Sequence, residues 1–233
     1  MTATTSSRSL LWARVFILLL GASVLVTGAQ LVKFIPDGIA GGILDGARNI
    51  TQGRGLVTNS INPAFLPYYK DLTLPLPYLW YPLVPFVTAG FFIVLGSHPW
   101  YLLIFPVAAY FLSALLLLEL GRRLFGIGAG LVAAVLLLAH PFMIETSMRE
   151  NFTDPVLIFL LIACVLAVFI AGSDEARRPM AWLVLAGVTL GLAQYARSAA
   201  TTLYVLMAFL IVSSFEEKRG ARLAVFLGSC LAI

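Results

Sequence analysis

Long apolar runs dominate the pattern of hydrophobic and polar positions along the chain. Six of these runs approach the length of about 20 residues that a helix needs to cross the hydrocarbon core of a bilayer. The corresponding helices are predicted at residues 10–33, 100–121, 126–143, 155–172, 181–195 and 199–215. A seventh apolar run, residues 221–233, is too short to cross, so we expect the chain to be the N-terminal part of a longer protein. The pattern predicts an all-α membrane protein, a polytopic bundle of transmembrane helices in which residues 1–233 are the N-terminal part of a single domain.

The first apolar run has two interpretations. Arg8 and Arg14 precede its apolar core, and Thr27-Gly28-Ala29 resembles the small-residue site at which a signal peptide is cleaved. The length of the run and the absence of a polar domain after it favour an uncleaved transmembrane helix.

Residues 34–99 interrupt the apolar pattern and form a predicted outer loop. A polar stretch is followed by a Pro-rich, aromatic sequence that leads into the apolar residues 78–96. Cytoplasmic loops carry an excess of Lys and Arg, so the basic residues indicate whether 78–96 crosses the membrane. If it does not cross, nine of the fifteen Lys and Arg residues lie on the same side as the N-terminus. Pro82 and Pro85 also interrupt a helix, so we predict a juxtamembrane or re-entrant helix at the outer face.

Composition supports the membrane class and excludes several others. The chain is 61% apolar and 11% charged, with a mean hydropathy of +0.97, which excludes a soluble enzyme, a disordered tail and a disulfide scaffold. The net charge is +4. In so apolar a chain the basic residues are expected to orient the helices in the membrane, and we expect no binding of nucleic acid. His98 and His140 are isolated, so no metal site is predicted, and the sequence indicates no cofactor.

Three polar stretches share the outer side in this topology, namely residues 34–77, 144–154 and 195–197. Asp37 follows the first predicted helix, where a partly desolvated carboxylate can act as a general base, or it caps the helix that follows. Arg48 and Arg54 are solvated loop charges or ligands of a phosphate. The intervening Gly53 is expected at a helix C-terminus.

The other two polar stretches add further candidates. Glu145, Arg149 and Glu150 lie in a short turn at the membrane surface, where a purely structural role does not explain them. Asp154 precedes Pro155 and is expected to cap the next helix. Arg197 lies between two apolar helices, where it is either part of a functional site or extends to lipid headgroups.

Glycines between residues 126 and 130 raise the possibility of nucleotide binding, which the pattern does not support. Gly126-Ile-Gly-Ala-Gly130 has neither the spacing nor the preceding strand of a dinucleotide motif. We expect these glycines to permit close packing of two helices instead.

Several short motifs occur in a characteristic order along the chain. An acidic residue beyond the first helix is followed by the segments 47–49 (Ala-Arg-Asn), 53–55 (Gly-Arg-Gly), 74–96, 121–126, 140–155 and 185–197. This order resembles the membrane glycosyltransferases of the GT-C fold, and in particular the group of protein O-mannosyltransferases and bacterial aminoarabinose transferases. The resemblance extends over nearly the whole chain.

The resemblance implies a transferase that takes a sugar from a polyprenyl-phosphate carrier on the outer side of the membrane. It implies that Asp37 helps to activate the acceptor hydroxyl. Asp45 is a second candidate for this role, because Ile39 stands where the family usually has its acid. Leu74-Pro-Leu-Pro77 replaces the Lys- or His-Pro-Pro signature of the family. The candidate ligands of the donor phosphate are Arg48, Arg54, Lys70, Arg149 and Arg197, with Glu145 and Asp154 as supporting residues.

We therefore expect a multi-pass protein of a bacterial plasma membrane with its active site facing outward. Its partners would be a lipid-linked sugar donor, an acceptor that is a lipid, a glycan or a protein, and the surrounding membrane lipids. The alternatives are a transporter or flippase, which would carry charges in mid-helix, and a non-catalytic membrane subunit.

Overall fold

The computed structural model describes residues 7–31, 38–59, 75–78, 81–148, 153–173, 176–214 and 219–233. The helices in these ranges are α1 (Ser7–Leu31), α2 (Gly38–Thr51), α3 (Leu83–Leu95), α4 (Ile104–Phe125), α5 (Ile127–Leu138), α6 (Pro141–Met148), α7 (Thr153–Gly172), α8 (Pro179–Ala196), α9 (Leu203–Ser214) and α10 (Arg219–Leu231). Two 3₁₀-helices, η2 (Pro99–Leu103) and η3 (Ser198–Thr202), lead into α4 and α9. Strands β1 (Val57–Thr58) and β2 (Leu76–Pro77) pair antiparallel, with Val57 opposite Pro77.

Membrane-spanning length is reached by four helical segments within the described ranges. These are residues 8–28 of α1, η2 together with α4, α7 and α8, and the bent pair of α5 and α6 makes a fifth if it is one span. Many large apolar side chains are exposed, including Val94, Phe125 and Val205 at 76–79%, as expected for surfaces that face lipid. The prediction of an all-α, polytopic membrane protein is confirmed.

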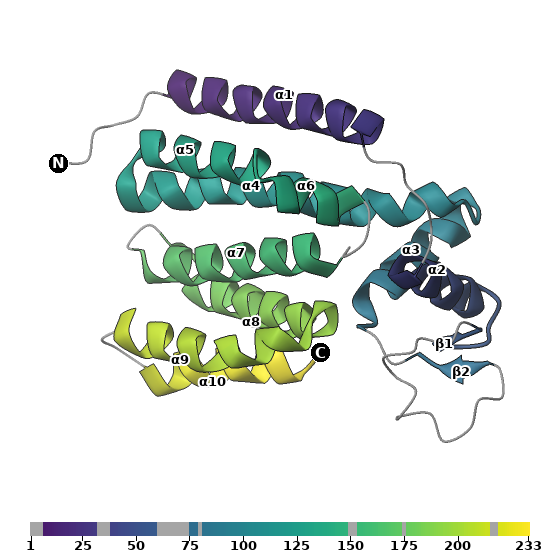
Figure 1. Ribbon diagram of the computed structural model, residues 1–233. Helices are drawn as coiled ribbons and strands as arrows, with labels where there is room; N and C mark the ends of the chain where they lie inside the picture. The colour runs from purple at the N-terminus through teal and green to yellow at the C-terminus, as the bar shows by residue number, and fades with distance from the viewer. Residues whose placement is uncertain are drawn as a thin grey trace.

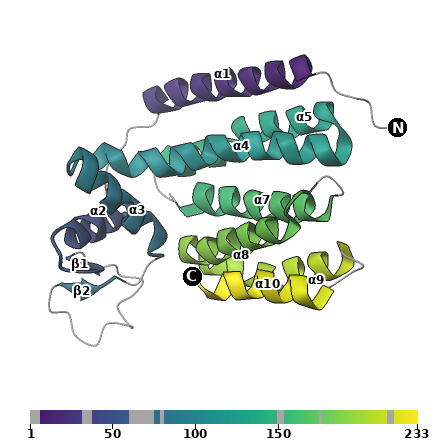
Figure 2. The same ribbon diagram turned by 180° about the vertical axis from the view of Figure 1, so that it is seen from behind.

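The long helices form a layered bundle. Figures 1 and 2 show α1, the α4–α5 pair, α7, α8 and the α9–α10 pair side by side in this order, while α2, α3 and the two strands gather at one end. The larger buried cluster includes Val156 and Leu160 of α7 with Leu183 and Leu190 of α8. A smaller cluster joins α1 to α4 and α5. The larger cluster also includes Ile43 of α2 and Val84 of α3, so the core of the bundle extends to the α2–α3 layer.

Glycines set the closest helix contacts. A Cβ added to Gly121 of α4 would lie 2.5 Å from the Cα of Gly130 in α5, so neither position has room for a side chain. The close helix packing expected for the glycines of residues 126–130 is therefore found at Gly130. Gly126 has a different role, because its φ of +93° forms the turn between the two helices. In α8, a Cβ on Gly191 would lie 2.9 Å from the carbonyl oxygen of Cys230 in α10.

The structure divides the predicted helix over residues 126–143. Helix α5 ends at Leu138, α6 begins at Pro141, and the two are bent by 54°. Proline has no N–H for the preceding turn and disfavours helical backbone at the residue before it, here His140. Proline at the first position of α6 therefore begins a new helix rather than extending the old one.

Helix α3 lies within the predicted non-spanning segment 78–96. Its 13 residues extend roughly 20 Å at about 1.5 Å per residue, which is less than the hydrocarbon thickness of about 30 Å. It buries Val84, Ala89 and Phe92 in the larger cluster, and Figure 1 shows it with α2 at the end of the bundle. The structure therefore favours a juxtamembrane position for this segment.

Candidate functional site

The two ends of the bundle differ in character. One end carries α2, α3, the two strands, the end of α6, the start of α7 and the end of α8 (Figure 1), and we call it the α2–α3 end. The opposite end carries the start of α1, the turn from α4 to α5, the end of α7, the start of α8, the end of α9 and the start of α10. We call this the arginine end because it bears Arg14, Arg122, Arg123, Arg177, Arg178, Arg219 and Arg222.

An ion pair connects two helices at the α2–α3 end. Nη1 of Arg197 contacts Oδ1 of Asp154, whose side chain is 11% exposed, compared with 38% for that of Arg197. Asp154 is the second residue of α7, which begins at Thr153, so it lies in the first turn of the helix and not at the cap position expected from the sequence. Arg197 directly follows α8 in extended backbone, with φ −164° and ψ 130°. Each charge is favourable at its helix end, because the N-terminus of a helix attracts anions and the C-terminus attracts cations.

The ion pair bears on both interpretations of Arg197. A guanidinium has five N–H donors in a planar fork, so one contact with Asp154 leaves donors for a further acceptor. The partial exposure of Arg197 makes them accessible. Asp154 therefore orients Arg197 while leaving it capable of binding a phosphate.

Asp45 anchors the segment that follows α2. Its Oδ2 accepts hydrogen bonds from the Thr58 hydroxyl (3.0 Å) and from the backbone N–H of Asn59, and its Oδ1 accepts one from Nδ2 of Asn59 (3.1 Å). One turn later on α2, buried Asn49 donates to the carbonyl oxygen of Val57 at 3.0 Å. Both Asp45 oxygens are thus occupied, which favours a positioning role over that of a free base.

The arginines of the first outer loop are exposed. Neither Arg48 nor Arg54 forms an ion pair with a residue that the structure describes. Gly53 (φ +72°) and Gly55 (φ +78°) follow the end of α2 in left-handed backbone, which supports the C-terminal role expected for Gly53. Arg48 and Arg54 therefore present exposed cations near the end of α2.

The remaining candidates come from the first outer loop and from the stretch 144–154. Asp37, Lys70 and Arg149 lie outside the described residues, as does Glu150. In sequence, Asp37 directly precedes Gly38, the first residue of α2. Glu145 lies on α6 with an exposed side chain.

The structure adds residues that the sequence did not single out. The Tyr81 hydroxyl lies 3.3 Å from Oγ of Ser198, which joins the segment before α3 to the residue after Arg197. Tyr78 packs its ring on Gly46 of α2, where a Cβ would lie 3.2 Å from it, and burial raises the pKa of Tyr78. Tyr81 thus connects the segment before α3 to the end of α8, and Tyr78 connects the same stretch to α2.

The described ranges contain no group of three His, Cys, Asp or Glu side chains that could hold a metal ion. The chemistry available there is that of guanidinium, carboxylate and hydroxyl groups. This set is suited to binding a phosphate and moving a proton.

Comparisons with known proteins identify the family. The family model described as dolichyl-phosphate-mannose-protein mannosyltransferase matches residues 76–233, which include Asp154 and Arg197 but not Asp37, Asp45, Arg48 or Arg54. Comparisons with curated proteins and with solved structures gave no significant match. The family match confirms the resemblance drawn from the motifs and favours the transferase over the transporter. The chain therefore belongs to the dolichyl-phosphate-mannose-protein mannosyltransferase family, the members of which are GT-C membrane glycosyltransferases that use a lipid-linked sugar donor.

Proposed function

We propose that the α2–α3 end is the catalytic end and faces outward, and that the protein transfers a sugar there from a polyprenyl phosphate to an acceptor hydroxyl. The observation that carries this proposal is the Asp154–Arg197 ion pair, which holds a partly exposed cation at the end that also bears α2. The arginines of the opposite end support the orientation, because positively charged residues near helix ends mark the cytoplasmic side.

The proposed reaction requires a base and a cation. Asp37 accepts the proton of the acceptor hydroxyl, the acceptor oxygen forms a bond to the anomeric carbon of the sugar, and the bond from that carbon to the phosphate oxygen breaks. The polyprenyl phosphate leaves with the electron pair of that bond. Arg197 stabilises the negative charge on the departing phosphate, because a donor that Asp154 already holds in place can act on charge as it develops.

The remaining candidates have supporting roles in the proposed reaction. Arg48, Arg54, Lys70 and Arg149 are further ligands for the donor phosphate, and Glu145 is a supporting residue. Asp45 remains a second candidate for the base. Its three hydrogen bonds favour the view that it holds the segment after α2 in place.

Cysteine labelling with an impermeant reagent tests the orientation. In a background with Cys164→Ala and Cys230→Ala, single cysteines at exposed positions Gln52 and Ala199 should react in intact cells. Cysteines at Arg177 and Gly220, which are exposed at the arginine end, should react only after permeabilisation.

Two outcomes of the labelling would contradict the proposal. Reaction at Arg177 or Gly220 in intact cells would place the arginine end outside. Reaction at Gln52 and Ala199 from opposite sides would separate α2 from the end of α8 and dismantle the proposed site.

A further inference from the structure

We propose that Arg14 and Arg123, held in place around Glu119, bind the phosphate headgroup of an anionic phospholipid at the arginine end. This corner of α1 and α4 is at the opposite end of the bundle from α2 and α3 (Figure 1). The proposal therefore does not depend on the transfer reaction.

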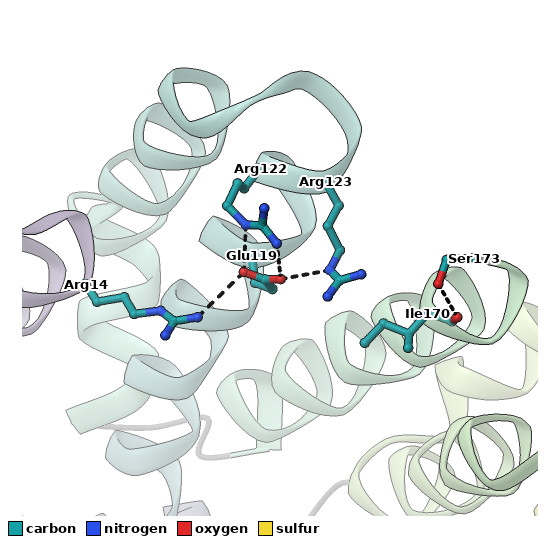
Figure 3. A network of polar contacts seen from close by, with 6 residues as sticks. All are labelled: Arg14, Glu119, Arg122, Arg123, Ile170 and Ser173. Atoms are coloured by element: carbon teal, nitrogen blue, oxygen red, sulfur yellow. Dashed lines mark hydrogen bonds and ion pairs between the residues drawn. The ribbon is translucent and has the colours of Figure 1, made fainter. Parts of the chain in front are cut away.

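One carboxylate organises three guanidinium groups at this corner (Figure 3). Arg122 binds Glu119 through two donors, with Nε 3.0 Å from Oε2 and Nη2 2.7 Å from Oε1. Arg123 donates from Nε to Oε1 at 2.8 Å, and Nη2 of Arg14 lies 3.7 Å from Oε2. Glu119 is thus shared between the last turn of α4 and the neighbouring helix α1.

Glu119 does not neutralise the corner. Three guanidinium groups and one carboxylate leave a formal surplus of two positive charges, from Arg14, Arg122 and Arg123 against Glu119. Like charges so close together repel each other, so a further anion would stabilise the cluster. The side chains of Arg14 and Arg123 are 53% and 30% exposed and therefore accessible to it.

The surplus of charge is largest at α1 and α4. In the sequence, Arg177 and Arg178 are preceded by Asp174 and Glu175, and Lys218 and Arg219 are preceded by two glutamates. The first connection is balanced, and the second, with Arg222 included, keeps a surplus of one positive charge. Glu119 alone accompanies the three arginines of the cluster among the described residues, which leaves a surplus of two. An anion is therefore attracted to this corner more than to the rest of the arginine end.

The surroundings favour a lipid over a free anion. Trp12 on α1 is 69% exposed, and Leu18, one turn after Arg14 on the same face of α1 and nearer the middle of the bundle, is 51% exposed. Tryptophan is typical of the membrane interface, where its ring lies at the headgroup level. Basic sites between transmembrane helices bind acidic headgroups, and the apolar side chains here offer a surface for acyl chains.

The contacts available suit a phosphate in particular. Arg123 uses Nε for Glu119, which leaves its two terminal nitrogens to form a parallel pair of hydrogen bonds with phosphate oxygens. Arg14 approaches Glu119 through one terminal nitrogen only. A phosphodiester between them would join α1 to α4 more firmly than the 3.7 Å contact does.

Native mass spectrometry of the purified protein tests this site. The delipidated protein is incubated with equal amounts of phosphatidylglycerol and phosphatidylcholine, and the lipids that remain bound are counted. We expect the wild type to retain phosphatidylglycerol, and Arg14→Gln/Arg123→Gln to weaken its binding roughly 10-fold or more, because each charge-assisted bond is strong. The control, Arg178→Gln/Arg219→Gln, removes the same charge from the same end and should change binding by less than about 2-fold.

Four results would overturn the proposal. The first two are an equal loss of binding in the two double variants, which would indicate a diffuse electrostatic field, and equal retention of phosphatidylglycerol and phosphatidylcholine. The third is displacement of the lipid by millimolar inorganic phosphate, which would indicate a site for free anions. The fourth is unchanged lipid binding in both double variants. If the double variant does not fold, Arg123→Lys serves instead. It keeps the charge but loses the planar fork, so its binding should be intermediate, and wild-type binding would contradict the proposal.

Discussion

The ion pair between Asp154 and Arg197 gives the sharpest test of how the α2–α3 end is built. Asp154 is 11% exposed and Arg197 is 38% exposed, so the pair lies between a surface pair, which contributes about 0–1 kcal/mol, and a buried one, whose disruption costs about 3–5 kcal/mol. We therefore expect Asp154→Asn or Arg197→Gln to lower the free energy of unfolding by about 1–3 kcal/mol. Arg197→Gln should cost more, because it leaves the more buried charge without this counter-ion.

A double-mutant cycle isolates the contribution of the pair. The two single variants and the double variant are unfolded by a denaturing detergent in mixed micelles, and the free energy of unfolding is extrapolated for each. The double variant should be less destabilised than the sum of the single variants, with a coupling energy of about 1–3 kcal/mol. Asp154→Glu, which keeps the charge on a longer side chain, should recover part of the loss.

An additive cycle would refute this reasoning. Independent sites add to within about 0.3–0.5 kcal/mol, so a coupling energy in that range would show that the two charges do not interact in the membrane. Arg197 would then be expected to extend to the headgroups on its own, which is the other interpretation of this residue.

Two further predictions follow from the outer loop and the helix packing. Asp37→Asn should lower the turnover number by a factor on the order of 10²–10⁴, the usual range for a lost general base. Asp45→Asn should mainly loosen the segment after α2 and have a mild effect on the turnover number. Transfer assays that show the reverse order would assign the base to Asp45. Gly130→Leu should prevent stable folding, because its Cβ would clash with the carbonyl oxygen of Leu118, whereas Gly128→Leu enters open space and should be tolerated. Equal yields of folded protein for these two variants, measured by size-exclusion chromatography, would contradict the packing of α4 on α5.

The apolar pattern predicted most of the bundle because bilayer thickness imposes the length of spanning helices. Residues 100–121, 155–172 and 181–195 all fall largely within helices α4, α7 and α8. The juxtamembrane character of α3 was also accessible, since prolines and basic clusters are local signals. Such signals extend over a few residues, so they can be recognised in the sequence without knowing how the helices pack against one another.

The contacts within the site were harder to predict. Asp154 and Arg197 were assigned to the same side of the membrane, but their pairing depends on the packing of α7 against α8, which apolar periodicity does not determine. The hydrogen bond from Thr58 to Asp45 similarly depends on how the chain turns back after α2. The Glu119 cluster had a readable signal, because Arg122 and Arg123 follow Glu119 at the spacings of three and four residues that form helical ion pairs.

The Michaelis constant for the lipid-linked sugar donor in Arg197 variants tests the central claim most directly. If Arg197 holds the donor phosphate at the α2–α3 end, Arg197→Ala should raise this constant by roughly 10- to 100-fold, as expected for a lost charge-assisted contact. Arg197→Lys should be intermediate, because it keeps the charge and loses the fork. Michaelis constants equal to that of the wild type in both variants, with folding intact, would contradict the account.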